Sequence, residues 1–353
     1  MNILITGGCG FVGSSLAIHF KQKYSQYNIK VIDNLKRRGS ELNLSRLHAF
    51  GINFIHGDIR IKQDFEHIKN IDLIIDAAAE PSVQAGLDGT PDYLIETNFT
   101  GTYNTLELAR KLRSSIIFLS TSRIYSIPTL ESIKYEVTDS RFSISPNQDI
   151  IGLSANGISE KFDVSAYRSL YGTTKLASEM LVQEYNALFG LESVINRCGV
   201  LTGPWQMGKV DQGFIVLWLA KHYWKRELSY MGYGGTGKQV RDFLHVADLF
   251  RLVDWQIHNI SKVNGEVFNV GGGFKSNLSL KELTTLCQEI TGNTIPINSI
   301  EGNRKADIPL YITDNTKITD FTGWSPSISV NETLTDVFHW MNENELVLKP
   351  ILS

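Results

Sequence analysis

Residues 1–16 read MNILITGGCGFVGSSL, an apolar run that breaks into four glycines. The β-branched run after Met1 predicts a strand, and the spacing that follows Gly13 predicts a helix. Gly7, Gly10 and Gly13 form a GxxGxxG pattern between the two. Because missing side chains let the backbone approach a pyrophosphate at a helix N-terminus, the stretch predicts a dinucleotide-binding turn. The alternative is an ordinary tight turn between strand and helix.

An aspartate follows this turn at the distance that a dinucleotide site requires. Asp33 ends the second predicted strand, twenty residues after Gly13. A carboxylate there accepts hydrogen bonds from the adenosine ribose and repels a 2′-phosphate, so the sequence predicts NAD and not NADP. Asp58, in HGDIR after the third strand, is a further candidate near the adenine. A plain strand-ending aspartate is the alternative for Asp58.

Short β-branched runs alternate with helical spacing through the first part of the chain. The predicted strands cover Asn2–Thr6, Lys30–Asp33, Asn53–His56, Leu73–Ala77 and Ile116–Ser120, and the predicted helices cover Ser14–Lys23, Tyr93–Leu112 and Tyr171–Phe189. This alternation predicts βαβ units and an α/β fold built on a doubly wound parallel Rossmann sheet.

The pattern loosens in the later part of the chain, where aromatic residues, glycines and basic residues mix. We therefore expect a Rossmann domain over 1–195, with a return segment near 243–272. A smaller α/β substrate domain on its C-terminal side is expected over 196–242 and 273–345. The segment 135–168 has weak periodicity and is long for a loop, which predicts a functional insertion or lid.

The composition excludes several classes of function. The 353 residues are 42% hydrophobic and 20% charged with a formal net charge of -3, and this balance predicts no nucleic-acid partner. No apolar run approaches the ~20 residues that span a bilayer, and the N-terminus lacks a leader pattern. We expect no membrane association and a cytoplasmic location. Three cysteines and eight scattered histidines show no ligand spacing, so we expect no metal and a reducing compartment.

A second pattern, YGTTK, opens a predicted helix with Tyr171 and Lys175 on one face. A lysine ammonium can stabilise a tyrosine phenolate. Moving a tyrosine pKa from near 10 toward 7 requires about 4 kcal/mol. One cation at ~4 Å in an effective dielectric of ~20 supplies about that much. The pair predicts a catalytic base, and a solvated helix face is the alternative.

Nine stretches of the sequence together resemble one enzyme family. They are TGGCGFVGS, VIDNLKRRG, HGDIR, ETNFTGTYNTLE, STSRIY, YGTTKLASE, DQG, GKQVRDFLHVADL and FNVGGG. The chain resembles the extended short-chain dehydrogenases/reductases of the nucleotide-sugar epimerase and dehydratase group, and within it the CDP-paratose 2-epimerases. The resemblance implies NAD as cofactor and a nucleotide-diphosphate sugar as substrate. It further implies epimerisation at C2 through a transient 2-keto sugar and reversible hydride transfer, in surface polysaccharide precursor synthesis.

The resemblance also implies roles for individual residues. The catalytic residues would be Thr121, Tyr171 and Lys175. The cofactor contacts would be Gly7, Gly10, Phe11, Val12, Asp33, Asn34, Asp58, Ile59, Ala77, Ala78, Asn98, Tyr171 and Lys175. The substrate contacts would be Glu80, Ser122, Arg123, Asn196, Gln206, Asp211, Gln212, Arg241 and Arg304. For Arg241 and Arg304 the guanidinium fork suits a diphosphate, and a surface arginine is the alternative.

The chain departs from the family pattern at two places. The fourth strand usually ends in an HxAxQ-like run, whereas here it ends in DAAAEPSV, with Asp76 and Glu80 at the matching positions. The motif of the fifth strand usually closes with glycine, and here Ser126 follows Tyr125. Glu80 and the loop after it would border the sugar, or would form only a capped strand-to-helix loop.

Three other functions fit the same fold. A 4,6-dehydratase usually carries an Asp-Glu pair directly after the strand-five threonine, where this chain has Ser122 and Arg123. A C4 epimerase needs the same three catalytic residues and is the main alternative. A non-catalytic NAD-sensing protein would commonly lose the tyrosine or the lysine, and this chain keeps both.

The predicted helices over Tyr93–Leu112 and Tyr171–Phe189 carry apolar residues on more than one face. One face must cover the sheet and the remainder needs a partner. Related enzymes pair these helices across a two-fold axis, so we expect a homodimer or homotetramer. Replacing Leu106 with a charged residue is expected to dissociate this assembly. The alternative is a monomer in which both helices only cover the sheet.

Overall fold

The computed structural model describes residues 1–87, 89–209 and 212–353. The chain divides into two compact units. Unit 1 consists of Met1–Ile124, Ser169–Cys198 and Leu249–Phe268, and unit 2 consists of Tyr125–Arg168, Gly199–Asp248 and Asn269–Ser353. The segment 125–168 therefore belongs to unit 2, whereas the boundaries expected from the sequence assign it to the Rossmann part.

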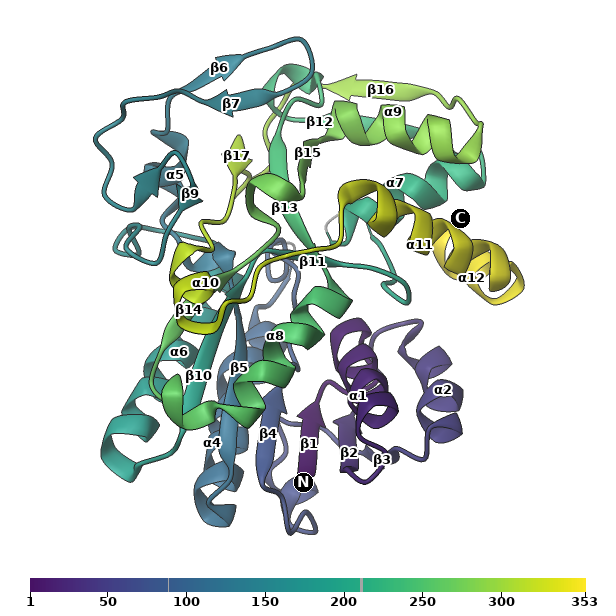
Figure 1. The fold of residues 1–353 in the computed structure, drawn as a ribbon. Coiled ribbons are helices and arrows are strands. Elements are labelled where there is room, and N and C mark those ends of the chain that lie inside the picture. The colour runs from purple at the N-terminus through teal and green to yellow at the C-terminus, as the bar shows by residue number, and fades with distance from the viewer. Residues whose placement is uncertain (88, 210–211) are drawn as a thin grey trace. The chain divides into compact units, whose positions relative to one another are not determined.

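Unit 1 is built on a seven-stranded sheet with the order β14-β10-β5-β4-β1-β2-β3 (Figure 1). Its strands are β1 (Asn2–Thr6), β2 (Asn28–Asp33), β3 (Asn53–His56), β4 (Leu73–Asp76), β5 (Ser115–Thr121), β10 (Ser193–Cys198) and β14 (Val267–Val270). The neighbours from β3 to β10 pair in parallel. This arrangement confirms the predicted doubly wound sheet. The direction of winding reverses between β1 and β4, where such sheets bind ligands at the carboxyl ends of their strands.

Two layers of helices accompany this sheet. The helices of unit 1 are α1 (Phe11–Lys23), α2 (Asn43–Ala49), α3 (Asp92–Ile95), α4 (Gly101–Leu112), α6 (Leu170–Phe189) and α8 (Val246–His258), with short turns η1 (Ser40–Leu42), η2 (Lys62–Phe65), η4 (Ser122–Ile124) and η6 (Ile260–Lys262). On the face covered by α4 and α6, strand residues such as Leu4 and Phe118 form a buried cluster with Leu106 and Val182. Alternate strand side chains point to opposite faces, so the other face also needs cover. There, α1 and α8 stack through His19 and Phe250 (Figure 1).

Local signals fix both ends of α6, the helix that carries YGTTK. Ser169 is the N-cap, and its hydroxyl accepts a hydrogen bond from the Gly172 amide at 3.1 Å. Gly190 ends the helix with a φ of 66°, a left-handed conformation that glycine adopts without strain. Tyr171 therefore lies in the first turn, directly after a defined cap.

The helix predicted over Tyr93–Leu112 is interrupted by a π-helical segment, η3 (Glu96–Thr100), between α3 and α4. A π segment holds one residue more than the corresponding α-helical turn, and such insertions often occur at functional sites. Asn98 lies inside it and is 1% exposed. Apolar periodicity alone does not reveal such an insertion.

Burial in unit 1 corrects the expected dimer test. Leu106 is fully buried in the cluster between α4, α6 and the sheet. A charge there would disrupt the core of a single chain, so it would not report on assembly. Large apolar side chains that are exposed on these helices include Tyr103, Met180, Leu188 and Phe189.

Unit 2 contains a mixed sheet formed by β11 (Val200–Thr202), β13 (Val240–His245), β15 (Asn277–Ser279) and β17 (Leu310–Tyr311). A parallel pair, β12 (Leu228–Met231) and β16 (Ile297–Ile300), lies apart from it. The helices of unit 2 are α5 (Ile127–Glu131), α7 (Phe214–Tyr223), α9 (Leu280–Thr291), α10 (Thr316–Thr322), α11 (Val330–Glu343) and α12 (Glu345–Leu352), with turns η5 (Tyr233–Gly235) and η7 (Gly273–Lys275). Helices α9 and α11 begin with capping boxes at Ser279 and Ser329.

The predicted insertion forms two small hairpins within unit 2. They are β6 (Tyr135–Val137) with β7 (Phe142–Ile144), and β8 (Leu153–Ser154) with β9 (Gly157–Ile158). Arg141 ties the first hairpin to Glu282 of α9 at 2.5 Å. Across the described part of the chain, no helix combines the length and the apolar character needed to cross a membrane.

Candidate active site

The glycine turn brings the carboxyl ends of β1 and β4 together. Gly7 has a φ of 63°, and a Cβ there would lie 2.8 Å from the Ala78 Cα. A Cβ on Gly13 would lie 2.3 Å from the Gly7 carbonyl oxygen. Gly10 is the N-cap of α1 and contributes no capping side chain. The turn therefore leaves room and backbone donors for a pyrophosphate beside Phe11 and Val12, which begin the helix.

Asp33 is held at the end of β2 by the backbone. Its Oδ2 accepts from the Cys9 amide at 3.0 Å, and its Oδ1 accepts from the Leu35 amide at 2.8 Å. Burial raises the pKa of Asp33, and these hydrogen bonds oppose the rise. A carboxylate has about four acceptor positions, so capacity remains for ribose hydroxyls.

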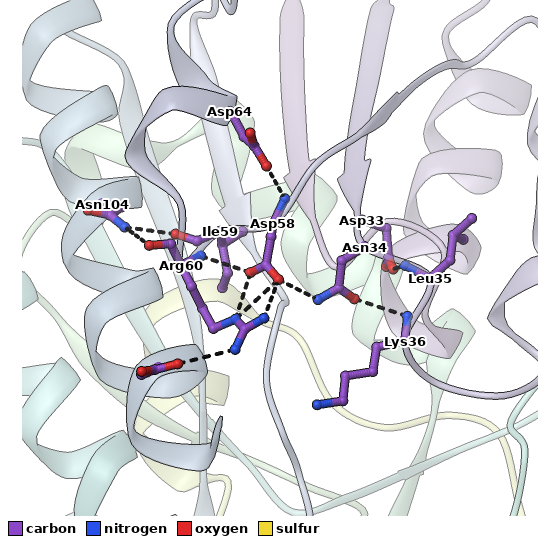
Figure 2. A network of polar contacts seen from close by, with 10 residues as sticks. Asp33, Asn34, Leu35, Lys36, Asp58, Ile59, Arg60, Asp64 and Asn104 are labelled. Atoms are coloured by element: carbon purple, nitrogen blue, oxygen red, sulfur yellow. Dashed lines mark hydrogen bonds and ion pairs between the residues drawn. The ribbon is translucent and has the colours of Figure 1, made fainter. Parts of the chain in front are cut away.

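Asp58 is the centre of the polar network drawn in Figure 2. Its Oδ2 accepts from Arg60 Nη2 at 2.7 Å and from Asn34 Nδ2 at 2.9 Å. Its amide donates to Asp64 at 2.7 Å. Although burial alone would raise the pKa of Asp58, the bonds from Arg60 and Asn34 take it to about 2. The Ile59 carbonyl is tied to Asn104 at 2.9 Å, so this loop is fixed from both sides.

Thr121 and Tyr171 are brought together from different elements. Thr121 ends β5, where it lies in register with Cys198 of β10, and Tyr171 lies in the first turn of α6. Burial raises the pKa of Tyr171 to about 12, while a hydrogen bond with Thr121 and the charge of Arg123 act to lower it. The Thr121 hydroxyl also accepts from the Arg123 amide at 3.2 Å. The charge of Arg123 thus acts on Tyr171, in addition to Lys175, to which the sequence assigns that role.

Lys175 is 2% exposed, and its Nζ lies 3.9 Å from the centre of the Phe118 ring. Burial lowers the pKa of Lys175 to about 8, and the charges of Asp76 and Glu179 oppose that change. The ammonium of Lys175 therefore lies over β5, next to β4, the strand that ends in Asp76. Its carboxylate neighbours were not predicted from the sequence.

Glu179 and Arg197 form a buried ion pair that sequence reasoning missed. Arg197 Nη2 lies 2.9 Å from Glu179 Oε2, with the two side chains 10% and 2% exposed. Ser120 donates a short hydrogen bond to the same carboxylate. This pair joins α6 to β10 and to the residue before Thr121. The available signal was the spacing, since Glu179 follows Lys175 by one helical turn.

Asn98 connects the loop after β4 to α6. Its side chain accepts from the Glu80 amide at 2.8 Å and donates to the Glu80 carbonyl at 3.1 Å. It also donates to Thr174 at 3.1 Å. In the same loop, the amides of Ala77 and Ala78 donate to a threonine of β1 at 3.2 and 3.1 Å. The predicted cofactor contacts of unit 1 thus lie after the carboxyl ends of β1, β2, β3 and β4, in η3, and in the first turns of α1 and α6.

The predicted substrate contacts divide between the units. In unit 1, Ser122 and Arg123 follow Thr121, whereas Asn196 is fully buried with both ends of its amide bonded to Gln256, at 2.8 and 2.9 Å. Glu80 is partly buried.

In unit 2, Arg241 on β13 pairs with Asp307 at 2.9 Å, in the loop that also carries Arg304. Gln206 is buried, and its amide bonds Leu201 at 2.8 Å and Thr202 at 3.0 Å. Gln212 is partly buried, and Asp211 lies outside the described residues.

Comparison with known proteins identifies the family. Residues 3–271 match the model of the NAD dependent epimerase/dehydratase family. The chain is 32% identical over 348 residues to the CDP-paratose 2-epimerase of Salmonella typhi, across 96% of this chain and 99% of that protein. The chain belongs to the NAD dependent epimerase/dehydratase family. The resemblance inferred from its motifs is confirmed.

Further similarities to known proteins follow the same pattern. The putative UDP-glucose 4-epimerase of Methanocaldococcus jannaschii is 27% identical, over 97% of this chain and 99% of that protein. The structure of UDP-glucuronic acid 4-epimerase from Bacillus cereus, in complex with UDP-glucuronic acid and NAD, matches with a TM-score of 0.79. It is 24% identical and covers 97% of this chain and 99% of that one, so this likeness concerns the fold.

Family membership confirms the expected cofactor, NAD, and the expected class, an NAD-dependent epimerase. The residues of unit 1 fit that cofactor. The close approach at Gly7 and the open start of α1 suit a pyrophosphate, and Asp33 keeps acceptor capacity for a ribose. The carboxylate of Asp33 would disfavour the 2′-phosphate of NADP.

Proposed function

We propose that this enzyme epimerises a nucleotide-activated hexose at C2, with a CDP-linked sugar as substrate. The observation that carries the proposal is the likeness to a CDP-paratose 2-epimerase along nearly the whole chain. It is supported by the Thr121–Tyr171 hydrogen bond and by Ser122 and Arg123, which stand where a 4,6-dehydratase usually has its acid and base.

In the proposed reaction, bound NAD supplies reversible acceptance and return of the C2 hydride. Tyr171, as the phenolate, removes the proton from the C2 hydroxyl, and Thr121 holds that oxygen. The product of this half-reaction is a 2-keto sugar. The sugar then turns its other face, and Tyr171 returns the proton to the oxygen. Because burial favours the neutral tyrosine, nearby positive charge is needed to make Tyr171 a base near neutral pH. In this proposal Lys175, one helical turn further along α6, supplies that charge together with Arg123 and the oxidised nicotinamide.

Epimerisation at C4 is the second candidate. The same three residues would serve it, because only the docking of the sugar differs. The likeness to a putative UDP-glucose 4-epimerase over almost the entire chain favours keeping it as the comparison in any assay.

The assay is a panel of CDP- and UDP-hexoses followed by NMR with purified enzyme and NAD. We expect conversion of CDP-paratose to its C2 epimer, and conversion only at C4 would overturn the assignment. The same reaction run in deuterated water tests the chemistry. A hydride that is retained on the cofactor predicts no deuterium at C2, and appreciable incorporation would contradict this route.

We also propose that the chain works in the cytoplasm as a homodimer or homotetramer, with surface polysaccharide precursors as the destination of its product. The assembly is supported by the exposed apolar side chains of Tyr103, Met180, Leu188 and Phe189 on α4 and α6. Met180→Glu should reduce the mass measured by light scattering toward 39.6 kDa, the mass of one chain. A wild-type mass of one chain would refute the assembly.

A further inference from the structure

Asp76 lies at the carboxyl end of β4 and is 1% exposed. Its Oδ1 is 2.5 Å from the hydroxyl of Thr6, the last residue of β1. That hydroxyl already accepts from the amides of Ala77 and Ala78, so its single proton must point at Asp76. The Thr102 hydroxyl lies 3.2 Å from Oδ2. A carboxyl group that receives donors in this way is suited to the ionised form.

Asp76 and the ammonium of Lys175 are both neighbours of Phe118. Asp76 is in register with Phe118 on the adjacent strand β5, and the Lys175 Nζ sits 3.9 Å from the centre of the Phe118 ring. Each group also acts on the other electrostatically. Burial raises the pKa of Asp76 and lowers that of Lys175, and the charge of each group opposes the change in the other.

The other titratable groups that face Lys175 are already occupied or neutral. Glu179, one turn further along α6, is paired with Arg197 and accepts from Ser120. The Cys198 thiol of β10 has its pKa raised by burial to about 12, so it carries no charge near neutral pH. Two carboxylates, Asp76 and Glu179, act on Lys175. Glu179 is also paired with an arginine, so Asp76 is the one that we consider further.

We propose that Asp76 is a positioning residue whose buried carboxylate favours the charged ammonium of Lys175 beside Phe118, at the carboxyl end of β4. This inference rests on the proposed function, in which Lys175 supports the catalytic tyrosine. Through Thr6, the residue before Gly7, the same carboxylate links Lys175 to the glycine turn.

The test measures the charge of Lys175 directly, without a sugar substrate. Protein labelled with ¹³C at the lysine Cε is titrated by NMR, and the Lys175 signal is identified by its loss in Lys175→Met. In the wild type the midpoint is expected near pH 8. Asp76→Asn should lower it by about one pH unit or more, because an opposite charge has been removed. Asp72→Asn, at the residue before β4 begins, should leave the midpoint in place.

The coupling must appear equally from the other partner, because linkage between two sites is reciprocal. In protein labelled at the aspartate Cγ, the titration midpoint of Asp76 should be higher in Lys175→Met than in the wild type. This second measurement decides the matter if Asp76→Asn fails to fold. Midpoints unchanged within about 0.3 pH units would overturn the role of Asp76. Inactivity toward every CDP- and UDP-hexose would instead contradict the proposed function, while the titration midpoints would still test the role of Asp76.

Discussion

The adenosine end and the catalytic end of unit 1 hold their charged groups in opposite ways. At the adenosine end, Asp58 and Arg60 are paired while 12% and 28% of their side chains stay exposed, and pairing takes the pKa of Asp58 to about 2. At the catalytic end, burial takes the pKa of Tyr171 to about 12 and that of Lys175 to about 8. One end stabilises its charges before a ligand arrives. The other disfavours charge until the ligand changes the surroundings.

Removing the hydroxyl at the catalytic end should have the largest effect. Tyr171→Phe is expected to lower turnover by about 10²- to 10⁴-fold, the range for loss of a general acid/base, while NAD affinity stays near that of the wild type. The measurement is NMR of CDP-paratose epimerisation, with calorimetry for NAD. Tyr185→Phe is the matched control, because this tyrosine of the same helix bonds Glu107 away from the site. Retention of most activity in Tyr171→Phe would make it a structural residue.

The buried ion pair Glu179–Arg197 and the more exposed pair Asp58–Arg60 should differ in their contribution to stability. Arg197→Met leaves Glu179 charged in a buried position and should lower the free energy of unfolding by about 3 to 5 kcal/mol. Arg60→Met breaks a more exposed pair and should lower it by about 1 kcal/mol or less. Urea unfolding of both variants provides the comparison. Equal losses would show that burial does not distinguish the two ends.

The carboxylate of Asp33 should matter for binding more than for folding. Asp33→Ala is expected to weaken NAD binding by about 1.5 to 3 kcal/mol, the range for hydrogen bonds to a charged group, and to reduce discrimination against NADP. Calorimetric titration with each dinucleotide measures both effects. Asp72→Ala, on the same sheet but at its amino edge, should bind NAD as the wild type does. An unaltered NAD affinity in Asp33→Ala would mean that the ribose binds elsewhere.

The smallest effect concerns acid pH at the adenosine end. The pKa of Asp58 is about 2 in the folded chain, below its ordinary value of 3.8. Its contribution to stability is therefore fully present above pH 3.8 and is lost as the pH falls through 2. The melting temperatures of wild type and Arg60→Met should differ most above pH 4 and converge toward pH 2. A difference that grows on acidification would contradict this assignment.

Local patterns were enough to predict the fold and to nominate the catalytic residues. The glycine turn, the strand runs and YGTTK each depend on neighbours in sequence, and the structure has the expected sheet. What the sequence did not reveal depends on distant partners. The pairing of Glu179 with Arg197, and the charge interaction of Lys175 with Asp76, arise only when α6 is packed on the sheet. The burial of Leu106 was missed because two apolar faces on one helix do not show which of them meets the core.

The π-helical segment sets the rotational phase of everything that follows it. Each residue turns an α-helix by about 100°, so the extra residue within Glu96–Thr100 rotates α4 relative to α3 by about that angle. Deleting one residue there would restore a regular helix but would swing Leu106 away from the sheet and detach Asn98 from the Glu80 loop. The length of this short segment is therefore constrained by the core and by the Glu80 loop. Insertions and deletions that ordinary surface loops accept would here misalign the core and the site together.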